Sequence, residues 1–169
     1  TQRLTNNAGH SYHPSVATVG SNVYVAWDDD TFGNTEIFFK RSTNNGVSWE
    51  GTQRLTYLAG TSCRPSLAVT GSIVYVAWDD NAFDVHREIY FKRSIDSGVT
   101  WEATQRLTYN SGRSEYPSIA ASGSNVYVAW QDDTFGNYEI LFKRSIDSGV
   151  SWEATQRLTY NTGFSEYPS

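Results

Sequence analysis

The sequence predicts an all-β protein made of repeated four-stranded antiparallel sheets, and three observations lead to that prediction. First, the pentapeptide Thr-Gln-Arg-Leu-Thr begins at Thr1, Thr52, Thr104 and Thr155, so a unit of about 51 residues recurs. Second, each unit contains four short extended runs between clusters of Gly, Asn, Asp and Ser. Third, polarity rises from the first run to the fourth. Together these features predict a β-propeller with three full blades and partial strands at both ends.

The first unit shows how each strand follows from its residues. The expected strands cover residues 13–19, 22–28, 36–42 and 48–56. The first consists of small residues, which suits the crowded strand nearest a propeller axis. The second is apolar on both faces, as expected of a strand that lies between neighbouring blades. The third is mixed, and the fourth is polar around a single Leu55, which suits an outer strand that faces water.

The repeat also sets the expected limits of the blades. Residues 1–12 supply the outer strand of a preceding blade and its connection, residues 13–56, 57–108 and 109–159 form blades 1, 2 and 3, and residues 160–169 begin a following blade. Propellers close with roughly four to eight blades. We therefore expect either a homo-oligomer or the remainder of a longer repeat array to close the ring. Without it, the outer blades would expose apolar faces beside Trp27 and Trp130.

Composition and charge exclude several functions. An aromatic content of 15% is too high for a disordered chain. A net charge of -5, with Lys and Arg spread through the repeats, argues against nucleic-acid binding. No apolar run is long enough for a membrane-spanning helix. The single Cys63 cannot form an intramolecular disulfide. No Ser-His-Asp or metal-ligand spacing is present, so we expect no cofactor and assign no catalytic residue.

An acidic run raises the question of a bound cation. Asp28-Asp-Asp30 followed by Gly33 is superficially similar to the start of a calcium-binding loop. The positions that would need oxygen ligands later in such a loop are occupied by Phe32 and Phe39. That geometry is therefore excluded and no metal site is assigned, although a different arrangement of the acidic residues in this stretch stays open.

A turn motif recurs between the third and fourth strands of every unit. The copies begin at Ser42, Ser94 and Ser145 and follow the pattern Ser-x-Asp/Asn-x-Gly-x-Ser/Thr-Trp. The Asp or Asn oxygen can accept backbone N–H groups within the turn, and Gly can adopt a positive φ without steric cost. The motif resembles the Asp-box of the bacterial neuraminidase (sialidase) repeat family, and the resemblance covers essentially the whole chain. It implies a six-bladed sialidase-like propeller.

The same resemblance implies that these turns are structural, because Asp-boxes lie opposite the active site in that family. The first copy departs from the pattern by having Asn44, which keeps the acceptor and loses the charge. The residues assigned to the structural turns are Asn44, Gly46, Trp49, Asp96, Gly98, Trp101, Asp147, Gly149 and Trp152.

Ligand-binding residues are expected on the opposite face, where the repeats differ most. There the fourth strand connects to the next unit and the second strand connects to the third. The connection from Asp79 to Glu88 has one extra residue and introduces Asp84 among others. The ligand-binding candidates on this face are Arg64, Arg87, Arg113, His13, Tyr116 and His86.

Three functions fit these residues. The resemblance implies an enzymatic alternative, a sialidase-like glycoside hydrolase or a fragment of one, which clamps a substrate carboxylate with three arginines and uses a Tyr paired with Glu. Glu115-Tyr116 recurs as Glu166-Tyr167, however, and a pair that recurs by duplication indicates scaffold rather than chemistry. We therefore predict a non-catalytic, secreted or surface-displayed module that recognises a glycan or a protein. A structural repeat of a cell-surface or filament protein is the remaining alternative.

Overall fold

The computed structural model describes residues 1–82 and 86–169, and all regular structure in that part of the chain is β-strand. Blade 1 consists of β1 (Ser11–Val19), β2 (Asn22–Asp29), β3 (Glu36–Ser42) and β4 (Gln53–Arg54). Blade 2 consists of β5 (Cys63–Thr70), β6 (Ile73–Asp80), β7 (Glu88–Ser94) and β8 (Gln105–Arg106). Blade 3 consists of β9 (Ser114–Ser122), β10 (Asn125–Asp132), β11 (Glu139–Ser145) and β12 (Gln156–Arg157). The predicted all-β fold is confirmed.

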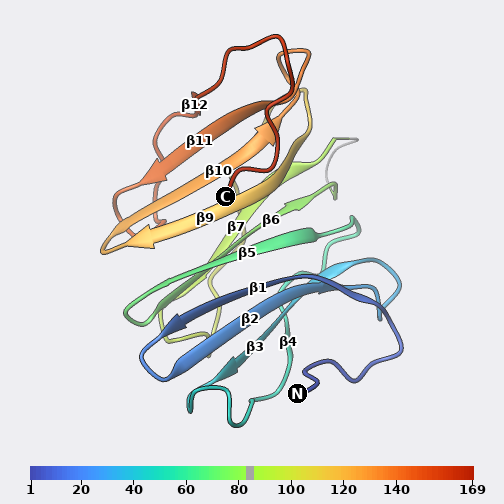
Figure 1. Ribbon diagram of the computed structural model, residues 1–169, viewed down its shortest axis with the longest axis vertical. Coiled ribbons are helices and arrows are strands. Elements are labelled where there is room, and N and C mark those ends of the chain that lie inside the picture. The colour runs from blue at the N-terminus through green and yellow to red at the C-terminus, as the bar shows by residue number, and fades with distance from the viewer. Residues whose placement is uncertain (83–85) are drawn as a thin grey trace.

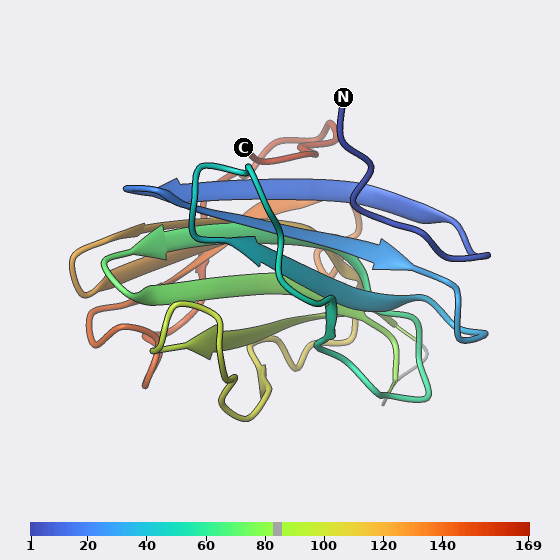
Figure 2. The same cartoon turned by 90° about the horizontal axis from the view of Figure 1, so that it is seen from below.

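Each blade is a four-stranded antiparallel meander whose strands follow one another in chain order. The three sheets are stacked along the long axis of the molecule, with the inner strands β1, β5 and β9 next to one another (Figure 1). Both chain ends lie on the side where β1 runs (Figure 2). Among the residues that the structure describes, none belongs to a helix of the length and apolarity that a membrane span requires.

The outer strands are much shorter than the sequence predicts. We expected the fourth strand of the first unit to cover residues 48–56, whereas β4 contains only Gln53 and Arg54. Most of that stretch is used by the turn, in which the N–H of Glu50 donates to the carbonyl of Arg41 at 2.9 Å. Leu55 then closes the pairing by donating to Ile37 at 2.7 Å. The outer edge of each blade is therefore held mainly by turn hydrogen bonds and side chains.

The core lies between the blades, and one face of each sheet packs on the opposite face of the next. In the first interface, Tyr24 and Phe39 of blade 1 meet Val76 and Trp78 of blade 2. The second interface repeats this arrangement, with the Tyr-bearing face of blade 2 on the Trp-bearing face of blade 3. Apolar residues on both faces of the middle strand make this two-sided packing favourable.

One expectation about the open faces was wrong. Trp130 points into the interface with blade 2 and is fully buried, so it does not mark the open face of blade 3. That face instead carries Tyr127 and Phe142, whose stacked rings are 6.1 Å apart. The error arose because successive residues of a strand alternate between its two faces, and the direction of stacking was not known.

Candidate functional site

The candidate site is the mouth of the propeller hub, formed where the inner strands begin. Four Xaa-Pro-Ser triplets, starting at His13, Arg64, Tyr116 and Tyr167, line a cavity of about 320 Å³ there. Each triplet comes from a different repeat, so the cavity brings together residues that are far apart in the sequence. We call this cavity the hub mouth.

In the three blades a β-bulge places the first residue of the triplet, and Tyr167 has the same positive φ. The residue before proline has a positive φ in every repeat, between 45° at His13 and 55° at Arg64. The pairing of β1 with β2 shifts register between Tyr12 and Ser15, on either side of Pro14. Proline cannot donate a ladder hydrogen bond, and a bulge redirects the side chain beside it. This backbone is strained for ordinary residues, and its recurrence indicates that the surrounding fold imposes it.

Polar groups at the end of each middle strand hold these bulge residues. His13 Nδ1 lies 2.9 Å from the buried carboxylate of Asp28. In blade 2, the guanidinium of Arg64 donates twice to Asp79, at 2.7 and 2.8 Å. The backbone N–H of the bulge residues is also used, since Tyr167 donates to Gln131 Oε1 at 3.1 Å.

The strongest electrostatic cluster of the site is centred on Asp79, which is fully buried. Arg87 Nη1 donates to Asp79 at 2.7 Å, in addition to the two bonds from Arg64. Both guanidinium groups also face Glu115, at 3.3 Å for Arg64 and 3.7 Å for Arg87. Two cations thus face two anions. Burial alone would lower the pKa of Arg64, but the hydrogen bonds and charge of Asp79 raise it above its ordinary value.

Aromatic rings complete the hub mouth. The guanidinium of Arg64 lies 4.0 Å above the ring of Tyr116. That ring meets Tyr167 edge to face, with 4.8 Å between the centroids. Tyr167 is 62% exposed, so a flat apolar surface faces solvent beside the charged cluster. Such a combination of aromatic surface and a few fixed polar groups is typical of binding sites.

Two further groups flank the cluster. Glu115 Oε2 accepts a hydrogen bond of 3.2 Å from the Tyr138 hydroxyl. Burial and the negative charge of Glu115 raise the pKa of Tyr138, which therefore keeps its proton at neutral pH. Burial also raises the pKa of the Cys63 thiol to about 11, so this cysteine is not a thiolate at neutral pH.

The predicted ligand-binding residues are thus distributed unevenly. The structure brings Arg64, Arg87 and Tyr116 together, and it places His13 across the hub mouth on blade 1. Arg113 is exposed at the rim of this face, where its N–H donates to Asp133 at 2.6 Å. His86 follows the segment 83–85 and its Nδ1 has no partner among the described residues. Asp84 lies outside the described residues.

Sequence reasoning missed the anions and the hydroxyl that organise this site. Asp79, Asp28 and Gln131 occupy equivalent positions at the ends of β6, β2 and β10. A signal was present, because the repeats with a basic bulge residue have Asp at this position and the repeat with Tyr116 has Gln. Within the described residues, no group of three or more His, Cys, Asp and Glu side chains is arranged to hold a metal ion.

The turns on the opposite face have the hydrogen bonds that their residues suggested. Asp96 Oδ1 accepts the N–H of Thr100 at 2.8 Å, and Asn44 Oδ1 accepts that of Ser48 at 2.9 Å. Gly98 has a φ of 81°. Hydrogen bonds from Thr100 lower the pKa of Asp96 well below its ordinary value, and Ser151 does the same for Asp147.

No protein-family model matches the sequence, and no curated protein matches it. Solved structures do match the fold. A Hadza microbial sialidase, Hz136, superposes with a TM-score of 0.67 at 17% identity, covering 84% of this chain and 36% of the sialidase. The sialidase of Trypanosoma rangeli in complex with 2,3-difluorosialic acid gives 0.67 at 14% identity, covering 88% and 31%. An α-L-arabinanase of Penicillium chrysogenum, complexed with arabinobiose, gives 0.65 at 15% identity, covering 90% and 51%.

These similarities define the class of protein. The chain is a sialidase-like β-propeller in fold, and it spans about a third of the length of the sialidases that it matches. At identities of 14–17% the likeness concerns the fold alone.

Proposed function

We propose that this chain belongs to a non-catalytic, secreted or surface-displayed propeller module that recognises carbohydrate at the hub mouth. One observation carries the proposal. Arg64 and Arg87 both donate to the buried Asp79, and both face Glu115. A guanidinium that is already paired in this way is not free to clamp a substrate carboxylate in bidentate fashion. Arg64 therefore orients the ring of Tyr116, and Arg87 helps to hold Asp79 in place.

The ligand class follows from what remains accessible. Tyr167 and Tyr116 present ring surface, and His13, which is 54% exposed, presents an imidazole edge. A sugar has an apolar C–H face that can lie on an aromatic ring and hydroxyl groups that can reach nearby polar atoms. Two of the matched structures are complexes with a sialic-acid derivative and with arabinobiose, which supports a glycan ligand for this fold class.

A glycan array tests the recognition function. We expect the fluorescently labelled chain to bind a defined set of glycans, and Tyr167→Ala to weaken that binding about tenfold or more. The matched control is Val99→Ala, which removes an exposed side chain from a turn on the opposite face. Binding that is equal in both variants would place the ligand elsewhere, and a protein partner would be indicated if no glycan binds while cell-surface proteins are captured.

One observation favours a second function, a sialidase-like hydrolase. Tyr138 and Glu115 are hydrogen-bonded at 3.2 Å, and a Tyr paired with Glu is what the resemblance to sialidases implies. A fluorogenic sialoside distinguishes the two functions. Under our proposal the chain does not release the fluorophore, whereas turnover that disappears in Tyr138→Phe would establish the hydrolase. Absence of both turnover and binding would leave the structural-repeat function.

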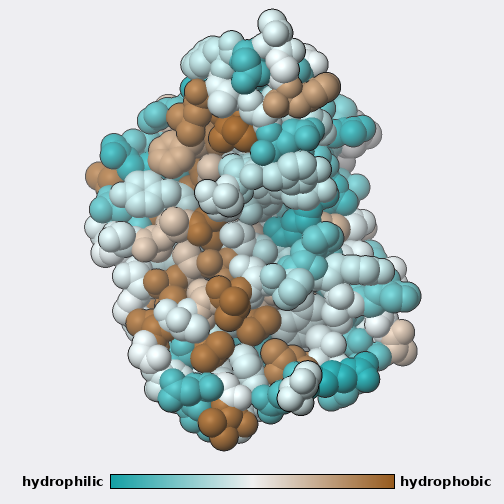
Figure 3. All heavy atoms as spheres, viewed as in Figure 1, coloured by the Kyte–Doolittle hydropathy of each residue, from teal (hydrophilic) through white to brown (hydrophobic). Residues whose placement is uncertain are grey.

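The same proposal includes a further blade of this repeat on each open face. Tyr127 and Phe142 of blade 3 are half-buried, whereas their equivalents in blade 2, Tyr75 and Phe91, are completely covered by the next blade. Apolar side chains are also exposed on the side where the inner strands lie, on the left and lower parts of the view in Figure 3. The hydrogen bonds of Arg144 differ from those of its equivalents in the same way.

The equivalents of Arg144 show what its next partner would be. Arg41 and Arg93 each donate to a turn carbonyl of the following blade, at 2.9 and 2.6 Å, and are 15% and 13% exposed. Among the described residues, Arg144 pairs within its own blade alone, with Glu153, and is 45% exposed. Light scattering is the test. A monodisperse species of 19.0 kDa would contradict an added blade, while a larger closed assembly would support it.

A further inference from the structure

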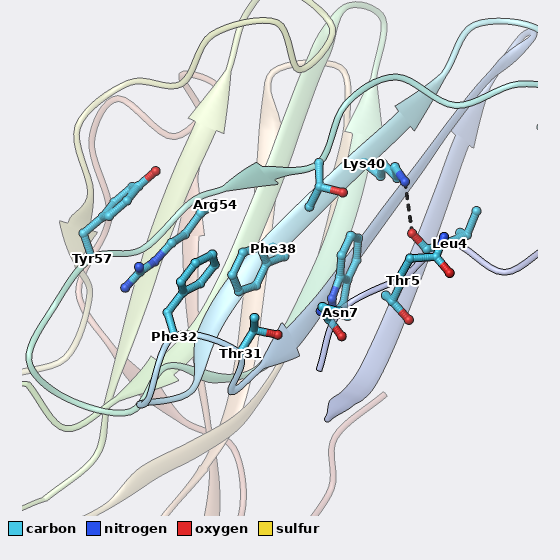
Figure 4. A pocket seen from close by; sticks show the side chains of 12 residues that line it. Leu4, Thr5, Asn7, Thr31, Phe32, Phe38, Lys40, Arg54 and Tyr57 are labelled. Carbon is cyan, nitrogen blue, oxygen red and sulfur yellow. Dashed lines mark hydrogen bonds between the residues drawn. The ribbon is translucent and has the colours of Figure 1, made fainter. Parts of the chain in front are cut away.

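A second kind of cavity lies at the outer rim, away from the hub mouth. Beside blade 1 it has a volume of about 610 Å³. Figure 4 shows the rings of Phe32 and Phe38 side by side on its wall, Arg54 and Tyr57 at one end, and Lys40 with Leu4 at the other. Trp27, which is nearly buried, forms another part of its lining. We call this cavity and its equivalents the rim pockets.

The same pocket is built again beside blade 3. It has a volume of about 410 Å³ and is lined by the repeat equivalents of the first pocket. These equivalents are Trp130 for Trp27, Phe135 for Phe32, Leu141 for Phe38, Lys143 for Lys40 and Arg157 for Arg54. Two pockets of equal design indicate that the repeat itself forms them.

Each rim pocket needs, from the preceding unit, only the short segment that follows the outer strand. Beside blade 3 this segment is residues 107–110, directly after β8, and beside blade 1 its equivalent is residues 4–7. The two segments are held alike, because Lys143 Nζ donates to the carbonyl of Leu107 at 2.7 Å and Lys40 Nζ to that of Leu4 at 3.0 Å. The pocket beside blade 3 persists with the preceding blade fully in place. The open face of blade 1 is therefore not its cause.

The arginine in the wall of each pocket packs on aromatic rings and has its charge paired. The guanidinium of Arg54 lies 4.6 Å from the ring of Tyr57 and 5.3 Å from that of Phe32. Its charge is offset by the buried Glu36 at 2.7 Å. Arg157 repeats this arrangement, at 4.2 Å from Phe135 and 2.9 Å from Glu139. An aromatic ring supported in this way presents a fixed apolar surface.

The lysine of each pocket has donors available beside that surface. Among the described residues, the ammonium of Lys40 donates to one acceptor, the carbonyl oxygen of Leu4. An ammonium group has three N–H donors, so two are left for a ligand. The indole N–H groups are not part of this set, because that of Trp27 is buried and that of Trp130 donates to Asp132 at 3.2 Å. Phe32 is 63% exposed and Phe135 50%, so both rings can be covered by a ligand. An apolar ring face beside free donors fits a molecule with an apolar face and a rim of hydroxyl groups.

We propose that the rim pockets beside blades 1 and 3 each bind one pyranose ring of a neutral carbohydrate, so that one chain carries repeated glycan sites. The arginines of the two pockets are already paired, Arg54 with Glu36 and Arg157 with Glu139, so neither guanidinium is free to hold the carboxylate of an acidic sugar. The inference rests on the proposed recognition function and extends it to a second type of site. Repeated weak sites would give the module avidity for a glycan-covered surface.

Indole N–H signals in ¹H–¹⁵N NMR spectra test the proposal on the full chain. The probes are the methyl pyranosides of glucose, galactose and mannose, titrated into the protein. We expect saturable shifts for Trp27 and Trp130, which line the two pockets. The signals of Trp49, Trp101 and Trp152 should stay in place, because these residues belong to the turns between the third and fourth strands and line neither pocket.

Each pocket also serves as the control for the other. Phe32→Ala should weaken the response of Trp27 about fivefold or more and leave that of Trp130 unchanged, and Phe135→Ala should do the converse. Both rings are at least half exposed, so folding is retained. A lack of saturable shifts with all three sugars would overturn the proposal, as would shifts that persist in both variants. Tyr167→Ala separates the two sites, since it removes hub binding and leaves rim responses intact.

Discussion

The two faces of the propeller differ in which features are the same in every repeat. At the end that carries the turns, Ser42, Ser94 and Ser145 make the same hydrogen bonds in all three blades. At the hub mouth only the backbone is constant, because the bulge recurs while its residue changes from His to Arg to Tyr. At the hub mouth the duplicated scaffold therefore fixes the direction of the side chain, while the type of residue changes from blade to blade. Function is expected where the side chains vary.

The largest effect is expected from Asp79→Ala, because that carboxylate neutralises two arginines. Its loss leaves Arg64 and Arg87, which are 17% and 21% exposed, without their closest anion. We expect a loss of about 3–5 kcal/mol in the free energy of unfolding, measured by urea denaturation. The matched control is Asp28→Ala, whose partner His13 is 54% exposed, and it should cost about 1–2 kcal/mol. Equal losses would mean that neutralising two arginines gives Asp79 no larger role in stability than Asp28 has.

The next largest effect on stability is expected from the glycines of the turns. Gly98 has a φ of 81°, and an added Cβ would lie 2.7 Å from the ring of Phe39 in the preceding blade. Gly46 has a φ of 78°, but its nearest neighbour would be Trp49 at 3.7 Å. Gly98→Ala should therefore cost about 2–4 kcal/mol, from strain and overpacking together. Gly46→Ala should cost about 1–2 kcal/mol, from strain alone.

Thermal and urea unfolding of both glycine variants measure this difference. The difference between the two losses in stability reports the contact between blades, because both glycines have the same place and a similar φ in their turns. If both variants lost the same stability, the turn would act only within its own blade, and the packing of Gly98 on Phe39 would be unimportant.

A double-mutant cycle at the hub mouth tests whether its side chains form exchangeable pairs. The described hydrogen bonds to the side chain of Asp28 all come from His13. His13→Tyr should leave a buried carboxylate without that partner and cost about 1–3 kcal/mol. Adding Asp28→Gln recreates the Tyr and Gln combination of blade 3 and should recover most of the loss. Urea denaturation measures the coupling energy, and additive losses would show that the pairs do not act as units.

The sequence was sufficient for the repeat, the strand order and the hydrogen bonds of the turns, because all of these are local. Strands β1, β2 and β3 begin within two residues of the predicted positions. The length of β4 and the orientation of Trp130 could not be predicted in this way, since both depend on how one blade meets the next.

The candidate site was only partly predictable for the same reason. The sequence indicated Arg64, Arg87 and Tyr116 as residues at positions where the repeats differ. Their shared partner Asp79 was not found, because Arg87 reaches it from a connection longer by one residue. The rim pocket beside blade 1 combines Leu4 with Arg54, which come from successive units of the repeat. No local pattern marks such a pair, although the recurrence of the whole unit does.

The smallest effect concerns pH and again compares the turns. The pKa of Asp96 and of Asp147 is lowered from an ordinary value of 3.8, because the ionised carboxylates accept hydrogen bonds from Thr100 and Ser151. A depressed pKa in the folded state means that these groups stabilise the fold above the unfolded value. That contribution is lost as the pH falls through the folded value. Asn44 makes equivalent bonds and does not titrate.

Replacing both aspartates by asparagine, as in D96N/D147N, should therefore make stability fall less steeply between about pH 5 and pH 2. The converse variant Asn44→Asp adds a third titrating turn and should make the fall steeper. Urea midpoints at several pH values measure both slopes, and the remaining carboxylates contribute equally to all three proteins. If neither variant changed the slope, hydrogen bonding to the charge would be unimportant in these exposed turns. Their constancy would then reflect backbone shape alone, set by the serine and the glycine.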